Sequence, residues 1–415
     1  MQVLLARLLS GSPLNERIFY ISFFGLLVML VIAWLLLDNR HKMKRRLIAG
    51  CVGLQVLLGV LLIEISLKER VFYGADKLIR GLMACSDKGA SMVFGEELVK
   101  GSFAFSVCPM IIFFSSLTAV LFHLHVLQWI VKWMARAMVW VMDVSGAESL
   151  CASANVFLGI TTAPLTVRPY LDTMTRSEIM ALMVGGMATA AGSTMPIYVK
   201  YGAQPGHLLV ASLMSAPAAL VVAKIMVPET EQSLTKGMVK VEIPREAANV
   251  FDAACRGAAD GLKLALNVAA MLIAFIALVY LVDWILLPTG RFLAEPLTLK
   301  QIFGWLGAPL AWVMGIEWRE AQQVGVLLGE KTAVNEVVAF ISLGKLQDTL
   351  SPRSFTIATY ALCGFANFGS IAVVIGGVGG LAPERRKDFA RYGFRSMLGG
   401  ALAAFMTACV AGMLI

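Results

Sequence analysis

Two stretches of this chain, one in each half, are variants of one another, and both place helix breakers and polar side chains inside apolar sequence. The first reads VMDVSGAESLCASANVFLGITTAPLTV and then LMVGGMATAAGSTM. The second reads VMGIEWREAQQVGVLLGEKTAVNEVVA and then ALCGFANFGSIAVV. Backbone that lacks helical hydrogen bonds is tolerated at bilayer depth only where protein or a cavity surrounds it. Paired interrupted segments are therefore typical of a transporter whose site lies where the two copies meet.

The letters of the two copies also suggest a register. Leu158 aligns with Leu328, and Ala188 aligns with Ala366. The copies begin on opposite faces of the membrane if one is entered from the cytoplasm and the other from outside. Such an inverted repeat offers one site to either side when the two copies exchange conformations.

The bulk composition agrees with a membrane protein. Of 415 residues, 58% are hydrophobic and only 15% are charged, and the mean hydropathy is +0.77. A net charge of +8 would also suit a nucleic-acid-binding protein. The basic residues instead cluster in short loops between apolar runs, where they set membrane orientation. We expect an all-α integral membrane protein without a nucleic-acid partner.

Apolar runs and basic loops predict about eight transmembrane helices, two re-entrant hairpins and interfacial helices. Loop 40–46 is rich in Lys and Arg and is expected to be cytoplasmic, which places both termini outside. The spans are expected at about 18–37, 47–63, 103–121, 179–199, 207–227, 264–287, 355–381 and 394–415. The hairpins are expected at about 146–171 and 321–346, because each arm of roughly 12 residues reaches only about half of a ~30 Å core.

The remaining segments complete the expected domain division. Tryptophan-rich stretches at 126–142 and 299–318 are typical of interfacial helices, and 68–100 is typical of an amphipathic surface segment. The expected units are a scaffold at 1–125, the first repeat of a transport domain at 126–227, a linker and scaffold span at 228–298, and the second repeat at 299–415.

Glu336 is the polar residue that most needs an explanation. A carboxylate in a membrane interior costs at least about 2.5–3.5 kcal/mol on insertion scales. A structural ion pair with Lys331 is one alternative to a binding role, although the spacing between the two residues is not the favourable three or four. Further polar side chains at the interruptions are expected to contact a ligand or to join helices, namely Asn155, Thr161, Thr162, Thr189, Ser193, Asn367 and Ser370.

Cation coupling has a separate physical basis. Helix ends at a break leave carbonyl oxygens without partners, and such oxygens together with an amide and a hydroxyl suit sodium. Asn155, Thr189 and the carbonyls near Leu158 and Ser193 supply this set. The sequence contains no nucleophile–base pair and no metal-ligand cluster, so we expect no enzymatic activity.

Three segments carry a likeness to a known family. LCGFANFGSIAVVIGGVGGLAPERRKDFARYGFRSMLGGALAAFMTACVAGML resembles the C-terminal end of the concentrative nucleoside transporters, and GxKxxxNExVAF and TAPLxVRPYLxxMTxSE are similar to two further signatures. The resemblance covers approximately Val141 to Ile415. It implies a homotrimer in the bacterial cytoplasmic membrane, in which a transport domain moves as an elevator against a scaffold and a sodium gradient drives nucleoside uptake.

The resemblance also implies roles for individual residues. Glu336, Asn367 and Ser370 correspond to ribose contacts with Phe365 beside them, and Asn155 with Thr189 corresponds to the sodium site. The residues expected around the substrate are Ile160, Thr161, Thr162, Lys331, Asn335, Glu336, Phe365, Asn367 and Ser370. Those expected around sodium are Asn155, Leu158, Thr189 and Ser193.

The tip of the first hairpin departs from the family pattern. Members typically read GQTEAPL there, with the Gln and Glu bonded to the nucleobase, whereas this chain reads GITTAPL from Gly159. Ile160 can neither donate nor accept a hydrogen bond, and Thr162 carries no negative charge. We therefore expect altered base selectivity.

Several functions remain open at this level. The first is a sodium–nucleoside symporter, with protons as an alternative coupling ion. The second is a carrier of phosphorylated nucleosides or other nucleoside conjugates, because a lost acidic group beside Lys331 and Arg168 favours anions. The third is a sensor that binds a nucleoside without carrying it.

Overall fold

The computed structural model describes residues 13–37, 45–64, 67–237, 247–291 and 296–415. Within these ranges the protein is helical, and the only strand-like pairing among them is a single bridge between Ser145 and Lys236. Most of the basic loop expected at 40–46 lies outside the described residues. The orientation of the termini therefore stays a prediction.

The N-terminal part consists of helices in the expected places. They are α2 (Pro13–Leu35), α3 (Arg45–Gly59) continued by a π-helical turn (Val60–Glu64), α4 (Leu67–Phe94), α5 (Glu96–Gly101) and α6 (Phe103–His123). The amphipathic segment expected at 68–100 is formed by α4 and α5, and α4 exposes both charged side chains and large apolar ones such as Tyr73 and Leu78.

The first repeat consists of α7 (Val126–Met142), α8 (Gly146–Leu158), the 3-10 helix η2 (Ala163–Thr173), α9 (Arg176–Ala188), α10 (Met195–Lys200) and α11 (Pro205–Met226). The returning arm of the first hairpin is thus a 3-10 helix. Pro164 and Pro169 lie in this arm and lack the backbone N–H that α-helical bonding requires.

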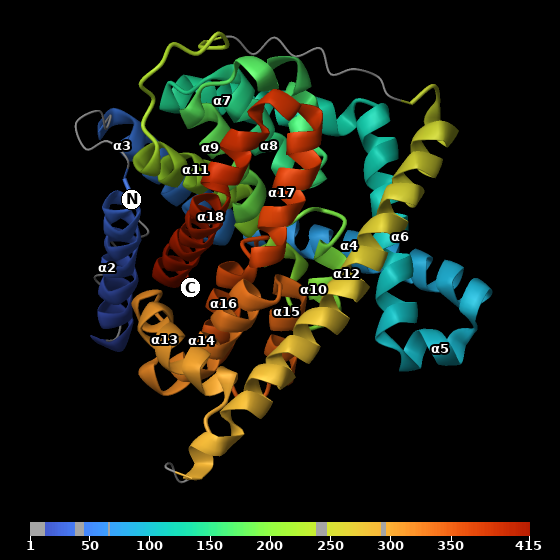
Figure 1. Cartoon of the computed structure of the whole chain (residues 1–415), viewed down its shortest axis with the longest axis vertical. Coiled ribbons are helices and arrows are strands. Elements are labelled where there is room, and N and C mark those ends of the chain that lie inside the picture. Colours follow the sequence, from blue (N-terminus) through green and yellow to red (C-terminus); the bar gives the residue numbers. More distant parts are fainter. Residues whose placement is uncertain (1–12, 38–44, 65–66, 238–246, 292–295) are drawn as a thin grey trace.

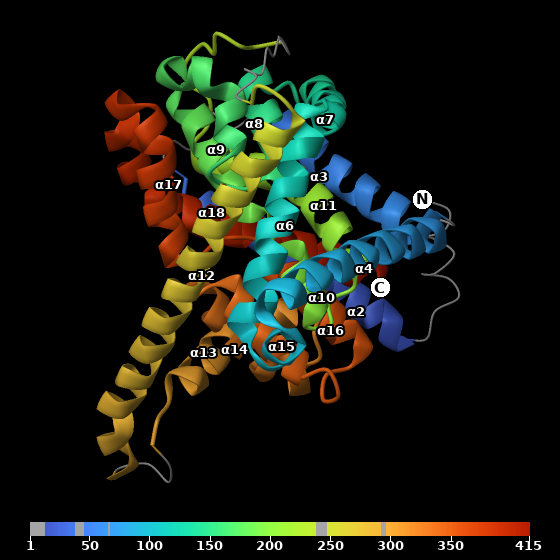
Figure 2. The same cartoon turned by 90° about the vertical axis from the view of Figure 1, so that its right-hand side faces the viewer.

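The connecting helix α12 (Val250–Leu286), followed by η3 (Leu287–Arg291), begins earlier than the span expected at 264–287. Asn249 caps it by accepting a hydrogen bond from the Asp252 N–H at 2.9 Å, so the charged stretch before the span is helical as well. α12 packs along α6 through a close approach at Gly257 and Gly261, where an added Cβ would come within 3.0 Å of α6 backbone atoms. The pair stands at the right-hand side of the molecule in Figure 1 and faces the viewer in Figure 2.

The second repeat consists of α13 (Leu299–Val313), α14 (Trp318–Ala333), α15 (Glu336–Lys345), α16 (Pro352–Leu362), α17 (Phe368–Leu381), the 3-10 turn η4 (Pro383–Arg385) and α18 (Arg386–Leu414). In both views α7, α8 and α9 lie at one end of the molecule, while α13, α14 and α15 lie at the other (Figure 1, Figure 2). The helices of the two expected hairpins therefore lie toward opposite ends of the molecule, in agreement with the predicted inverted repeat.

Five described helices are long and apolar enough to cross a membrane. These windows are Ile18–Leu35, Ala104–His123, Pro205–Met226, Val250–Gly290 and Pro383–Leu414, with shorter apolar helices at Leu47–Ile63 and Phe368–Leu381. The spans expected at 179–199 and 355–381 are each two half-helices, α9 with α10 and α16 with α17. The core is built around α11 and α18, which contact one another and are mostly buried.

Candidate functional site

The two broken spans place their interruptions inside the protein. α9 ends at Ala188 and α10 begins at Met195, while α16 ends at Leu362 and α17 begins at Phe368. The second half of each span contacts the hairpin of the other repeat, because α10 touches α15 and α17 touches η2. Half-helix ends leave backbone groups without intrahelical partners, so these contacts surround a polar interior.

The tip of the first hairpin docks on the first break. The Gly192 N–H donates to the Phe157 carbonyl at 3.1 Å, which joins the break to the last turn of α8. Gly159 ends α8 with a φ of 81°, and an added Cβ there would lie 2.7 Å from the Ala191 Cβ. Glycine is needed at this position for both its backbone conformation and the close approach.

The corresponding helices of the two copies end at different positions relative to the aligned letters. α8 ends at Leu158 whereas α14 ends at Ala333, five residues beyond Leu328. α9 ends at Ala188 whereas α16 ends at Leu362, four residues before Ala366. The corresponding helices therefore differ in where they stop, and the alignment of the two copies stays a prediction.

Glu336 lies at the centre of the candidate site. It is the first residue of α15 and is buried, and its carboxylate accepts a hydrogen bond from Asn367 Nδ2 at 3.2 Å. The Tyr198 hydroxyl lies 3.4 Å from its other oxygen. Asn335 caps the same helix by accepting from the Val338 N–H at 3.0 Å. The partial positive charge of a helix N-terminus stabilises a carboxylate placed there.

Asn367 holds the second half of the site. It caps α17, and its Oδ1 accepts from the Ser370 N–H at 2.8 Å and from the Ser370 Oγ at 3.1 Å. Its Nδ2 reaches Glu336, so one side chain joins the N-termini of α15 and α17. Phe365 lies at the tip of the first hairpin, since an added Cβ on Gly159 would lie 4.0 Å from its Cε2. The structure thus brings Glu336, Asn367, Ser370 and Phe365 together.

The residues at the hairpin tip have separate neighbours. Ile160 packs on α9, where an added Cβ on Gly186 would lie 2.8 Å from Ile160 Cγ1. Thr161 faces α17 at Gly377, and both Thr161 and Thr162 are exposed. The apolar side chain of Ile160 therefore anchors the tip to α9.

Lys331 does not pair with Glu336. Its Nζ donates to the Ala361 carbonyl at 2.8 Å and lies 5.8 Å from the centroid of the Phe405 ring. The alternative of a structural ion pair between Lys331 and Glu336 is therefore wrong. Lys331 joins α14 to the last turn of α16, and its ammonium is held by a carbonyl and a ring face.

The residues that the sequence predicts around a cation lie at the first break or on α8, which packs against α9. Asn155 is fully buried and its Oδ1 has no hydrogen-bond partner among the described residues. The Thr189 hydroxyl donates to the Gly185 carbonyl at 2.9 Å and keeps its lone pairs free. Leu158 ends α8, and Ser193 is buried within the break. A buried acceptor without a donor is costly, and an uncharged set of hard oxygens fits sodium.

Tyr198 is a site residue that the sequence analysis missed. It is fully buried on α10, and its ring stacks on Phe340 of α15 with centroids 4.2 Å apart and an interplanar angle of 18°. A signal was present, because a tyrosine one turn after a break faces the same interior as the break itself.

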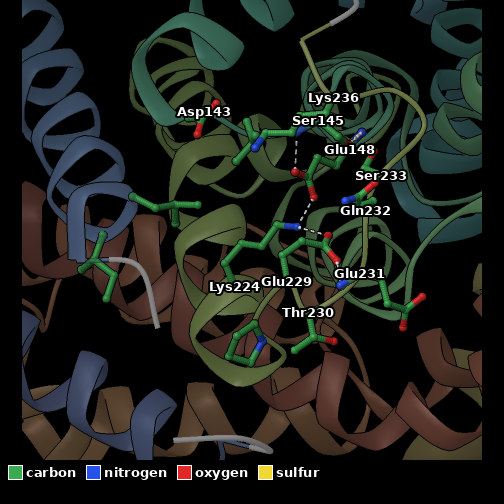
Figure 3. A pocket seen from close by; sticks show the side chains of 14 residues that line it. Asp143, Ser145, Glu148, Lys224, Glu229, Thr230, Glu231, Gln232, Ser233 and Lys236 are labelled. Atoms are coloured by element: carbon green, nitrogen blue, oxygen red, sulfur yellow. Dashed lines mark hydrogen bonds and ion pairs between the residues drawn. The ribbon is translucent and has the colours of Figure 1, made fainter. Parts of the chain in front are cut away.

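The sequence analysis also missed a buried cluster of charged side chains at the start of the first hairpin. Lys224 lies in the last turn of α11, and its Nζ lies 2.7 Å from Glu148 Oε2 and 3.3 Å from Glu229 Oε2 (Figure 3). The ammonium also donates to Ser177 Oγ at 3.0 Å. Lys224, Glu148 and Glu229 border a cavity of ≈ 420 Å³.

The same cluster closes two helix caps and fastens the linker. Glu148 completes a capping box with Ser145 at the start of α8, and Glu178 completes one with Thr175 at the start of α9. The linker adds two bonds, from Ser233 Oγ to Glu178 at 2.6 Å and from the Gly146 N–H to the Thr235 carbonyl at 2.9 Å. Lys224 therefore ties the starts of α8 and α9 to the end of α11.

Comparison with known protein families covers most of the chain. A family model described as "Na+ dependent nucleoside transporter C-terminus" matches residues 207–412. The corresponding N-terminus model matches residues 24–97, and a model named Gate, described as "Nucleoside recognition", matches residues 104–205.

Individual relatives agree with these matches. The chain is 40% identical over 396 residues to a Bacillus subtilis protein named "Uncharacterized transporter YutK", covering 94% of this chain and 98% of that protein. It is 36% identical over 411 residues to mouse "Sodium/nucleoside cotransporter 1", covering 95% of this chain. It spans only 63% of the length of that mammalian relative.

Solved structures share the fold. The chain is similar to CNTnw in an inward-facing substrate-bound state, with a TM-score of 0.89, 39% identity, and coverage of 96% of this chain and 98% of that chain. It is also similar to a CNTnw variant in an outward-facing state, with a TM-score of 0.91, 40% identity, and coverage of 96% and 99%.

We expect Lys224→Met to destabilise the folded protein by about 3–5 kcal/mol, because it leaves buried carboxylates without their cation. Thermal unfolding of the purified protein in detergent measures this effect. The exposed pair Lys263–Asp260 offers a control, and Lys263→Met should change the stability by less than about 1 kcal/mol.

A double variant separates the ion pair from simple packing. Adding Glu148→Gln to Lys224→Met should recover part of the lost stability, because the buried charge is removed together with its partner. Additive losses from the two substitutions would show that the pair is not coupled.

Proposed function

The chain belongs to the Na+ dependent nucleoside transporter family, whose members are membrane transporters and not enzymes, and from this premise we propose that it is a sodium-coupled symporter importing nucleosides or a closely related ribose-containing solute. The proposal includes an elevator-type alternating-access mechanism. One observation carries it, namely the buried carboxylate of Glu336, held by Asn367 where half-helices of both repeats meet.

This arrangement suits a sugar that presents neighbouring hydroxyl groups. A carboxylate accepts two hydroxyl donors in charge-assisted bonds, which are roughly twice as strong as neutral ones. The amide of Asn367 and the hydroxyl of Ser370 can each both donate and accept. A ribose therefore has partners for its hydroxyl groups, and Phe365 adds an apolar ring beside them.

Sodium is proposed to bind where Asn155, Thr189 and the carbonyl groups near Leu158 and Ser193 supply oxygen. The nearby bond from Gly192 to Phe157 joins this segment to the tip of the first hairpin. A cation held there orders the tip, so sodium favours the substrate-competent state and substrate tightens sodium reciprocally. A proton is the alternative coupling ion.

The proposed moving unit contains both repeats, at 126–227 and 299–415. Contacts of α18 with α9 and α11 join the two repeats of this unit, while α6 and α12 form a pair that belongs to the proposed scaffold. The proposal also includes a homotrimer in a bacterial cytoplasmic membrane, in which lipid or a neighbouring subunit would cover the apolar surface that α12 leaves exposed within one chain.

Base selectivity is proposed to differ from the usual family pattern. Ile160 points its apolar side chain onto α9, and the exposed Thr162 has a hydroxyl where the family has a carboxylate. The phosphorylated-nucleoside alternative depends on two cations beside the substrate, Lys331 and Arg168, and the structure gives neither a role at Glu336. Lys331 donates to Ala361, and Arg168 is exposed.

We expect Glu336→Gln to lower uridine uptake into proteoliposomes by at least about tenfold, because the charge that receives the sugar hydroxyls is lost. The exposed Glu97→Gln serves as the matched control and should transport normally. Normal uptake by the Glu336 variant, with an unchanged melting temperature, would remove Glu336 from the mechanism.

Asn155→Ala should raise the sodium concentration that gives half-maximal uptake, because it deletes the buried amide oxygen that has no other partner. Uptake rates measured over a sodium series at constant ionic strength test this expectation. An unchanged sodium response would indicate another cation site or coupling to protons.

Competition for radiolabelled uridine tests the substrate class. Uridine and adenosine should compete with affinities weaker by roughly ten- to a hundredfold than a fully hydrogen-bonded base would allow, and their monophosphates should not compete. Effective competition by monophosphates would favour the phosphorylated-nucleoside alternative. Binding without any counterflow would favour a sensor.

A further inference from the structure

Tyr198 connects the two repeats through its ring and through its hydroxyl. It belongs to α10 in the first repeat, yet it stacks on Phe340 and reaches Glu336, both in the second repeat. α10 and α15 are in contact, and they lie beside one another in both views (Figure 1, Figure 2). A buried tyrosine hydroxyl requires a hydrogen-bond partner, and the Glu336 carboxylate of the candidate site is one such partner.

The same hydroxyl also faces the first break. It lies 3.2 Å from Thr194 Oγ1, and the Thr194 hydroxyl donates to the Ala191 carbonyl at 2.9 Å. Gly192, next to Ala191, donates to Phe157 at the end of α8. A continuous series of contacts therefore runs from the first hairpin through Thr194 and Tyr198 to Glu336.

Because each hydroxyl group in this series carries a single hydrogen, the series has two alternative hydrogen-bond arrangements. Tyr198 has one hydroxyl hydrogen, so it donates either to Thr194 or to Glu336. While Thr194 donates to Ala191, its oxygen remains an acceptor for Tyr198. If the Ala191 carbonyl turns toward a cation, the Thr194 hydrogen is released, and Thr194 can donate to Tyr198. Tyr198 then donates to Glu336 and orients the carboxylate.

We propose that Tyr198 is a positioning residue whose hydroxyl transmits the state of the cation segment at 189–194 to Glu336, and so provides part of the coupling between sodium and nucleoside. This inference rests on the proposed function. It also assigns a role to Thr194, whose hydroxyl connects the Ala191 carbonyl to the Tyr198 hydroxyl. Coupling of this kind needs an element with two arrangements that both ligands bias, and the single hydroxyl hydrogen supplies one.

The test is the sodium dependence of nucleoside affinity in the purified full-length protein. Uridine dissociation constants are measured calorimetrically at saturating sodium and with choline replacing sodium. For Tyr198→Phe, which keeps the stacked ring, the ratio of the two constants should shrink by roughly 2- to 30-fold relative to the native chain. An equal loss of affinity in both conditions, with the ratio unchanged, would overturn the proposal, because a merely structural residue behaves in that way.

Tyr360→Phe is the matched control. Tyr360 is also fully buried, but its hydroxyl lies 3.0 Å from His207 Nδ1 on α11 and is outside the series of contacts. The same substitution there should leave the ratio of dissociation constants unchanged. A comparable loss of coupling in both variants would contradict a specific role for Tyr198.

A second readout needs no nucleoside and separates the two proposals. The melting temperature is followed over a sodium series for the native chain, Tyr198→Phe, Glu336→Gln and the double variant. Glu336→Gln should change the sodium midpoint in the native background, and this change should disappear when Tyr198 is Phe. An undiminished change would overturn the role of Tyr198 alone. The calorimetry gives the remaining outcome: a native chain that shows no sodium response here and binds no uridine there would overturn the proposed function together with this inference.

Discussion

The structure depends on the contact between the Asn367 amide and the Glu336 carboxylate. Each residue stands at the N-terminus of a half-helix, where unpaired N–H groups favour negative charge and caps. A single buried carboxylate without such partners would be prohibitively costly in a membrane interior. By joining α15 to α17, the contact makes the second hairpin and the broken span that follows it one polar unit, and it leaves oxygen atoms available for a sugar.

A different arrangement stabilises the first repeat. Lys224 joins the starts of α8 and α9 to the linker at the base of the first hairpin, and it lies far from Glu336 in the sequence. At its other end the hairpin is docked through Ile160 on Gly186 and through Phe157 on Gly192. The first hairpin is thus fixed at its base by charge and at its tip by small contacts. The tip is held by one apolar contact and one hydrogen bond, which a bound ion can rearrange more easily than the buried ion pairs at the base. The proposed coupling therefore lies at the tip.

Particular residues show how far the sequence could be followed. The interruptions were predictable, because Asn and Gly inside apolar segments mark caps and breaks, whereas the grouping of Glu336, Asn367 and Ser370 followed from the family resemblance. Tyr198 and Lys224 were missed, since each lies within a stretch that reads as an ordinary apolar helix. Lys224 had an available signal in the two S/T-x-x-E capping boxes, whose carboxylates need a cation once they are buried. Where each helix of the two copies ends could not be predicted from the aligned letters, because local caps decide helix ends.

The sequence by itself determined an all-α membrane protein, its two interrupted copies and the polar residues that interrupt them, because hydropathy and helix breaking are properties of short segments. Only the tertiary structure decided that Lys331 bonds to Ala361 and not to Glu336, that Ile160 packs on α9, and that Tyr198 crosses between the repeats. Those outcomes depend on which helices lie side by side, and segments distant in the chain become neighbours only when the two copies pack together.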